Sequence, residues 1–226
     1  MFAVGAAMCF RLPRGEFASA FPGIEHFPTT GSANLRFPFW RDLLLAQGFV
    51  DVSRRSIDYL LNRPEKGKAV GIVFGGVNEG AVATEDGSIH LKIRDQKGFV
   101  KVALQNGASL VPVLHLGENS LYTPVAGVDR RRLRNMQARY AQMLGGTVPP
   151  FVVGRSLIGL PWGGMFPMRS KLTSVVGSPI HVEAVEKPTQ EQIDTLHEAY
   201  CSQIVELFKS HKAKAQIPDG ATITFY

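Results

Sequence analysis

Cysteine is scarce in this sequence. Only Cys9 and Cys201 occur among 226 residues, and they lie far apart. They form no Cys-x-x-Cys pair and no spacing with histidine that is typical of a zinc site. This pattern excludes a disulfide-built scaffold and a cysteine-based metal centre. We therefore expect two reduced thiols that pack as small apolar groups.

Long hydrophobic runs are also missing. A helix that crosses a bilayer needs about 20 consecutive apolar residues, whereas the apolar start of the chain, MFAVGAAMCF, is ten residues long. No basic residues precede it, so it does not have the pattern of a signal peptide. The sequence as written predicts a soluble or membrane-surface domain.

Acidic residues are fewer than basic ones, 19 against 25, which gives a formal net charge of +6. This balance favours anionic partners such as phosphates or acidic lipid surfaces. The basic residues are scattered and are not interleaved with aromatic residues, which argues against a nucleic-acid partner.

Apolar segments of strand length alternate with a helical pattern between residues 68 and 116. This order predicts βαβ units, and hence an α/β fold with a mostly parallel or mixed sheet flanked by helices. The expected strands cover residues 68–74, 89–93 and 110–116, and the expected helix covers residues 97–106, with Gly107 just beyond its end. Other helices are expected to start near Pro38, Ser53 and Thr189, and other strands over residues 172–176 and 180–183.

Three polar loops containing glycine follow or join the strands of this region, over residues 75–79, 94–98 and 117–119. Ligands of open α/β sheets bind at the carboxyl ends of the strands. The sequence therefore predicts a site where these loops meet. Residues 129–144 have a basic amphipathic pattern, which fits either an ordinary solvated helix or a helix lying on anionic lipid.

The stretch RDQKGFVKVALQNGASLVPVLHLGEN, residues 94–119, resembles the longest signature of the type-2 diacylglycerol acyltransferase family, which includes monoacylglycerol and wax-ester relatives. Four further blocks agree in the same order: Phe21-Pro22-Gly23 with residues 34–44, residues 73–80, Gly154-Arg155, and residues 172–180 with 188–190. The resemblance covers nearly the whole chain. It implies a glycerolipid-acyltransferase-like fold over residues 1–214, followed by a loose tail over residues 215–226.

The resemblance implies transfer of a fatty acyl group from acyl-CoA, the co-substrate, to diacylglycerol or a related acceptor. It also implies an endoplasmic reticulum membrane location, and a homo-oligomer is possible. The family's general base lies in a His-Pro-His-Gly motif that this sequence does not contain, and Met1 corresponds to the position after it. The alternative is therefore a non-catalytic homologue that binds acyl-CoA or partner subunits.

The candidate catalytic residues are Glu79, to orient the acceptor hydroxyl, and Glu118 and Asn119 at a strand end. Each has a plainer interpretation as a loop or turn residue bound to backbone amides. His115 is the histidine expected nearest to the site, although a single strand histidine is usually a core residue. No covalent nucleophile and no metal site is expected.

The candidate acyl-CoA-binding residues are of two kinds: glycines in the predicted loops, and cationic residues near the start of the expected helix. Glycines let backbone N–H groups approach a ligand closely, and a helix N-terminus attracts phosphate. The residues are Gly75, Gly76, Arg94, Lys97, Gly98 and Lys101. The plainer interpretation of the last four is a solvated basic start of a helix.

Overall fold

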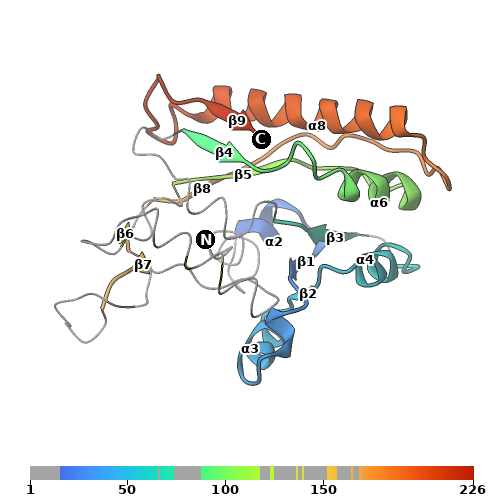
Figure 1. Ribbon diagram of the computed structural model, residues 1–226, viewed down its shortest axis with the longest axis horizontal. Coiled ribbons are helices and arrows are strands. Elements are labelled where there is room, and N and C mark those ends of the chain that lie inside the picture. Colours follow the sequence, from blue (N-terminus) through green and yellow to red (C-terminus); the bar gives the residue numbers. More distant parts are fainter. Residues whose placement is uncertain are drawn as a thin grey trace.

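A computed structural model of the chain describes residues 16–65, 67–73, 88–117, 123–124, 136, 139, 152–156, 164, 168–169 and 171–226. Helices and short strands are mixed along the chain, so the predicted α/β class is confirmed (Figure 1). In chain order the elements are α2 (Glu16–Ala20), β1 (Glu25–Thr30), the 3-10 helix η1 (Asn34–Arg36), α3 (Trp40–Ala46), β2 (Val50–Asp51), α4 (Arg54–Leu61), β3 (Lys68–Gly71), β4 (Ile89–Leu91), α6 (Gly98–Asn106), β5 (Val113–Leu116), β6 (Thr123–Pro124), β7 (Val152–Val153), β8 (Thr173–Val176), α8 (Gln190–His211) and β9 (Ile223–Phe225).

The first sheet has the order β2-β1-β3, and both pairings are parallel. Its central strand, β1, contains a proline, Pro28. Proline cannot donate a ladder hydrogen bond, and for this reason it argues against a central strand. Pro28 is nevertheless in β1, opposite Gly71, with the β3 pairing ending at that point. The β2 pairing then begins at Thr29.

The remaining strands pair as β4 with β9 in parallel, and β5 with β8 and β6 with β7 antiparallel. Each of β3, β4 and β5 is thus hydrogen-bonded to a strand from outside residues 68–116. Small parallel sheets and small antiparallel sheets therefore occur together, in line with the predicted α/β class, but the expected pairing of consecutive strands is not found among the described residues. Of the strand predicted over residues 180–183, only a bridge between Ile180 and Leu110 forms.

The loose tail expected after Lys214 is wrong for the end of the chain. Residues 223–225 form β9, which pairs with β4 from Ile89 to Leu91. Ala221 is buried in the main core beside this strand. Closing the β4 edge satisfies backbone groups that would otherwise face solvent unpaired.

The core lies between α8 and the strands β4, β5, β8 and β9, which run alongside that helix in Figure 1. Tyr200, Ile204 and Phe208 project from α8 at helical spacing onto Ile93 and Leu116. Phe208 is 2% exposed and Ile93 is fully buried. The apolar face that the sequence predicts for this helix is therefore the face that covers the strands.

Local sequence signals explain where the two main helices begin and end. Thr189 and Gln192 form the predicted capping box at the start of α8: Thr189 Oγ1 accepts from the Gln192 backbone N–H, and the Gln192 side chain accepts from that of Thr189. Gly107 ends α6 with φ of 59°, the left-handed conformation that glycine adopts at low cost.

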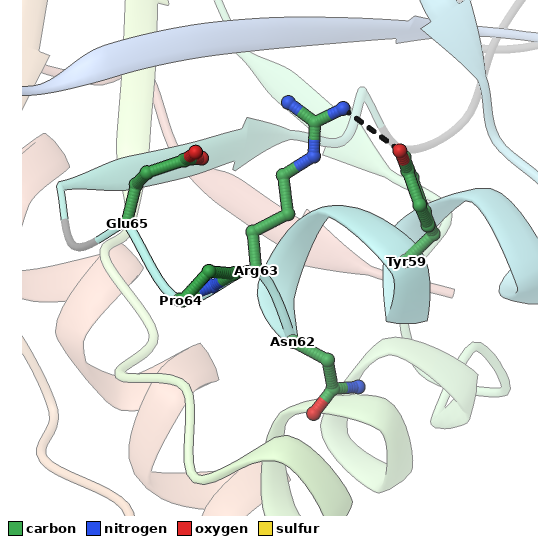
Figure 2. Close-up of a pocket in the computed structure, with 5 residues that line it drawn as sticks. All are labelled: Tyr59, Asn62, Arg63, Pro64 and Glu65. Atoms are coloured by element: carbon green, nitrogen blue, oxygen red, sulfur yellow. Dashed lines mark hydrogen bonds between the residues drawn. The ribbon is translucent and has the colours of Figure 1, made fainter.

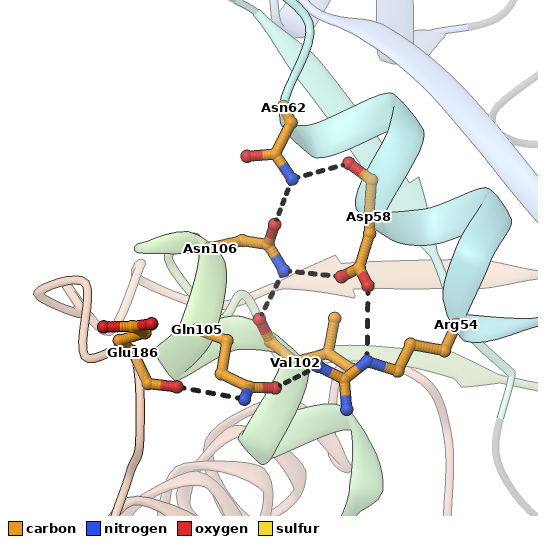
Figure 3. A network of polar contacts seen from close by, with 7 residues as sticks. All are labelled: Arg54, Asp58, Asn62, Val102, Gln105, Asn106 and Glu186. Atoms are coloured by element: carbon orange, nitrogen blue, oxygen red, sulfur yellow. Dashed lines mark hydrogen bonds and ion pairs between the residues drawn. The ribbon is translucent and has the colours of Figure 1, made fainter.

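A polar network joins α4 to α6 and to the segment before α8 (Figure 3). Asn106 Nδ2 donates to an Asp58 carboxylate oxygen at 2.8 Å and to the Val102 carbonyl at 2.9 Å. Asn62 donates to Asn106 Oδ1 at 2.7 Å. Beside it, Arg54 donates to Gln105, which donates in turn to the Glu186 carbonyl. The network fixes the C-terminal half of α6 against α4.

Within the described ranges, no helix is long and apolar enough to cross a membrane. In the same part of the chain, no group of three or more histidine, cysteine or acidic side chains could hold a metal ion. Cys201 is a partly buried free thiol, and burial raises its pKa. Cys9 and most of the basic amphipathic segment 129–144 lie outside the described residues.

Candidate functional site

The described part of the predicted site is the start of α6. Ile93 follows the end of β4 by two residues and is fully buried. In the turn after it, the Gln96 backbone N–H donates to the Ile93 carbonyl at 3.0 Å. Lys97 is the N-cap residue, and Gly98 opens the helix. Arg94, Gly98 and Lys101 are exposed. Arg94 precedes the helix and Lys101 lies in its first turn, so two exposed cationic side chains lie near a helix N-terminus, whose dipole favours anions.

The third cation of this cluster is held by an ion pair that the sequence does not reveal. Lys97 Nζ lies 2.7 Å from Oδ1 of Asp194, a residue of α8. The Lys97 hydrogen bond, followed by one from Gln190, lowers the pKa of the Asp194 carboxyl. Both partners are well exposed, so solvent screens the pair and it contributes little to stability.

Lys97 thus ties α6 to α8, while Arg94 and Lys101 have no ion-pair partner among the described residues. The two free charges and the helix start are suited to an anion such as a phosphate group. The sequence predicts three equivalent cations here. The structure separates them into one that positions the helices and two that are available to a ligand.

The other predicted site residues lie outside the described ranges: Gly75, Gly76, Glu79, Glu118 and Asn119. The structure fixes only where their segments leave the strands. β3 ends at Gly71, and β5 ends at Leu116. Whether the three glycine loops meet at one edge stays a prediction.

Gly117, which precedes Glu118, has a conformation and a setting that exclude a side chain. Its φ is +96°, and a Cβ there would lie 2.5 Å from the carbonyl oxygen of Lys171. We expect Gly117→Ala to destabilise the fold by about 2–3 kcal/mol, measured by urea unfolding. Gly98→Ala is the matched control because no atom lies within 4 Å of its added Cβ. It should be neutral or stabilising by up to about 1 kcal/mol, and equal stability of both variants would contradict the account.

His115, the histidine expected nearest to the site, lies on β5 and is partly buried. Its Nδ1 is hydrogen-bonded to Ser174 Oγ on β8 at 2.8 Å. Burial lowers the pKa of His115 to about 4. The side chain is therefore neutral at pH 7 and links two antiparallel strands, as expected of a core histidine.

This histidine makes stability depend on pH in a defined window. Because the pKa is about 4 in the fold and 6.5 without burial, the unfolded chain binds more protons between these values. Stability should fall by up to roughly 3 kcal/mol as the pH drops from 6.5 to 4. In His115→Asn this extra loss should disappear, whereas His181→Asn, at an exposed histidine, should keep the wild-type slope. Chemical unfolding at several pH values measures how the free energy of unfolding depends on pH. The same pH dependence in wild type and His115→Asn would contradict the lowered pKa of His115.

The remaining described histidines have structural contacts. His197 is buried on α8 and donates from Nε2 to the Ile93 carbonyl at 3.0 Å, so it supports the turn before α6. His90 on β4 is hydrogen-bonded to Thr224 of β9. His211 lies near the Leu207 carbonyl in the last turn of α8. None of these contacts pairs a histidine with a carboxylate. The Cys201 sulfur lies 3.9 Å from His197 Nδ1, but burial raises the pKa of this thiol and so disfavours the thiolate.

A shallow, open pocket of about 470 Å³ lies at the end of α4 and is lined by Tyr59, Asn62, Arg63, Pro64 and Glu65 (Figure 2). Arg63 donates to the Tyr59 hydroxyl at 3.0 Å and lies over the Tyr59 ring. The pocket contains no predicted site residue. Its charged groups are already engaged, Arg63 with Tyr59 and Glu65 with Lys68, so the pocket adds no chemistry to the start of α6.

Comparison with known proteins identifies the family. The family model described as "Diacylglycerol acyltransferase" matches residues 1–226. Diacylglycerol O-acyltransferase 2 of Homo sapiens is 37% identical over 216 residues, which are 96% of this chain and 55% of that protein. 2-acylglycerol O-acyltransferase 1 of Mus musculus is 37% identical over 226 residues, all of this chain and 66% of that protein.

No solved structure gives a significant match. The chain spans between about half and two thirds of the length of these two relatives. The family match nevertheless extends over every residue, including the start of α6 and the loops that the sequence singles out. The chain therefore belongs to the diacylglycerol acyltransferase family.

Proposed function

We propose that this protein transfers a fatty acyl group from acyl-CoA to diacylglycerol or a related lipid alcohol. The observation that carries the proposal is the start of α6, where Arg94 and Lys101 are exposed near the helix N-terminus in a chain of this family. CoA carries several phosphate groups, which charge-assisted hydrogen bonds from arginine and lysine bind well.

In the proposed reaction the acceptor hydroxyl oxygen attacks the thioester carbonyl. A C–O ester bond forms, the C–S bond breaks, and CoA leaves with the proton that the hydroxyl loses. Glu79 would orient the acceptor hydroxyl, and the backbone N–H groups of Gly75 and Gly76 would face the developing oxyanion or a phosphate. Glu118 and Asn119 would orient the bound substrates.

His90, His115 and His197 are not offered as the general base, because their contacts support strands and helices. The acceptor lipid also implies work at a membrane. We therefore propose the endoplasmic reticulum membrane as its location, with homo-oligomerisation as an untested option.

The test is an acceptor panel. The purified protein is given acyl-labelled acyl-CoA with diacylglycerol, 2-monoacylglycerol or a long-chain alcohol in mixed micelles, and labelled lipids are separated. We expect labelled triacylglycerol or the corresponding ester with at least one acceptor. Binding of acyl-CoA by calorimetry without any acylated product would favour the alternative of a non-catalytic acyl-CoA-binding homologue.

A further inference from the structure

An exposed apolar patch surrounds the start of α3. Phe37, Phe39, Trp40 and Leu43 form it, and they are 46%, 87%, 39% and 48% exposed. Surface patches of large apolar side chains in a soluble fold usually mark a binding surface. The patch lies on an element that projects from the body of the fold, away from α6 and α8 (Figure 1).

The backbone at Phe39 holds its ring outward at a conformational cost. Phe39 has φ 63° and ψ −47°, a region that bulky residues rarely adopt. The turn is fixed by Trp40 N–H donating to the Pro38 carbonyl at 2.7 Å and Arg41 N–H donating to the Phe37 carbonyl at 2.9 Å. Such strain persists only where surrounding structure enforces it, and it often marks a functional element.

Buried residues of α3 and of the segment after it hold the patch in place. Leu44 is the buried residue of α3, and Phe49, just after the helix, is buried as well. Gly48, with φ of 76°, turns the chain between them, and its N–H donates to the Leu45 carbonyl at 2.9 Å. One face of the short helix is thereby anchored while the patch faces solvent.

The charged side chains near the patch indicate which kind of partner it binds. Arg36, which precedes the patch residues, and Arg41, which lies among them in the sequence, are both exposed. Arg41 pairs with its neighbour Asp42 at 3.2 Å, and Arg36 has no ion-pair partner among the described residues. Guanidinium groups bind phosphate, and tryptophan favours the interface between headgroups and acyl chains. Aromatic and leucine side chains flanked by arginine match a phospholipid surface.

A second copy of the chain is a poorer occupant. With side-chain areas of about 150–250 Å², the four exposed fractions leave roughly 400 Å² of apolar surface. A stable protein interface buries about 800 Å² on each partner. We therefore propose that the α3 patch inserts into the surface of a phospholipid bilayer. The inference goes beyond acyl transfer and is tested without it.

The fluorescence of Trp40 measures directly whether the patch inserts into a bilayer. The chain has two tryptophans, Trp40 and Trp162, so Trp162→Phe leaves Trp40 as the only tryptophan. With phosphatidylcholine vesicles, we expect its emission to shift to the blue and to be quenched by brominated acyl chains. No shift and no quenching would overturn the proposal. A blue shift that depends on protein concentration without vesicles would overturn it in favour of a dimer.

Phe39→Gly separates binding from folding. Glycine accepts the positive φ at this position, so the variant should keep or raise Tm while its vesicle affinity, measured by co-sedimentation, falls about ten-fold or more. Tyr59→Ser is the matched control, because Tyr59 is an aromatic side chain 64% exposed on α4. It should bind vesicles like wild type. Unchanged vesicle affinity of Phe39→Gly, or an equal loss in Tyr59→Ser, would contradict the proposal.

Discussion

Glu79→Ala should lower the rate of acyl transfer about 100-fold or more while leaving the protein folded. Glu79 is proposed to orient the acceptor hydroxyl, and groups that position or activate a reacting hydroxyl typically contribute 10²–10⁴-fold. Because the residue lies in a polar loop of the sequence, its removal should not disturb the core. The measurement is the initial rate of labelled ester formation, with circular dichroism and Tm as checks of folding.

Glu65→Ala is the matched control for this variant. Glu65 is an exposed loop glutamate, 3.7 Å from Lys68 at the start of β3, and it lies in the shallow pocket instead of the predicted site. Its removal should leave the rate within about two-fold of wild type, as expected for a weak surface ion pair. Wild-type activity in Glu79→Ala would remove Glu79 from the mechanism.

The double variant Arg94→Ala/Lys101→Ala should weaken acyl-CoA binding about 100-fold. Each charge-assisted hydrogen bond to phosphate contributes roughly 1.5–3 kcal/mol, and about 2.7 kcal/mol corresponds to a factor of 100 in Kd. The folded state should be little affected, because both side chains are exposed and unpaired within the described residues. Calorimetric titration with a non-transferable acyl-CoA analogue gives the Kd.

Two comparisons make this result specific to the CoA phosphates. Lys209→Ala removes an exposed cation from the last turn of α8 and should bind like wild type. An S-acyl pantetheine, which lacks the nucleotide phosphates, should bind equally to wild type and to the double variant. An unchanged acyl-CoA Kd in the double variant would place the phosphates elsewhere on the protein.

The sequence predicts well those elements whose signals are local. The capping residues Thr189 and Gln192 and the helix-ending Gly107 are where the sequence predicts them. Ser53 is likewise the N-cap of α4, although no hydrogen bond from its side chain forms there. In each case neighbouring residues determine the backbone, so no knowledge of distant contacts is needed.

Strand pairing depends on distant contacts, and there the sequence predicts less. Nothing in the alternation of Ile89 and Leu91 shows that residues 223–225 pair with them. Pro28 makes β1 difficult to predict, because proline is rarely found in a central strand. Both strands are stabilised by partners more than 40 residues away, which a pattern within one segment cannot identify.

The candidate site shows the same division. The helix start and its cations follow from residues 94–101, whereas the partner of Lys97 is on α8. Asp194 is one of several acidic residues on that helix, and nothing near it in the sequence indicates a partner 97 residues away. The exposure of the Phe39 ring could not be predicted from the sequence either. An apolar segment such as residues 37–45 predicts burial, and only the backbone conformation shows that this ring faces solvent.

The most direct test of acyl transfer is a single-turnover experiment. The protein is mixed with acyl-labelled acyl-CoA and diacylglycerol in micelles, and free CoA, labelled lipid and labelled protein are measured over time. The account predicts labelled triacylglycerol appearing at the same rate as free CoA, with no label on the protein. Release of CoA without acylated lipid, or label accumulating on the protein before the lipid, would contradict direct transfer to the acceptor.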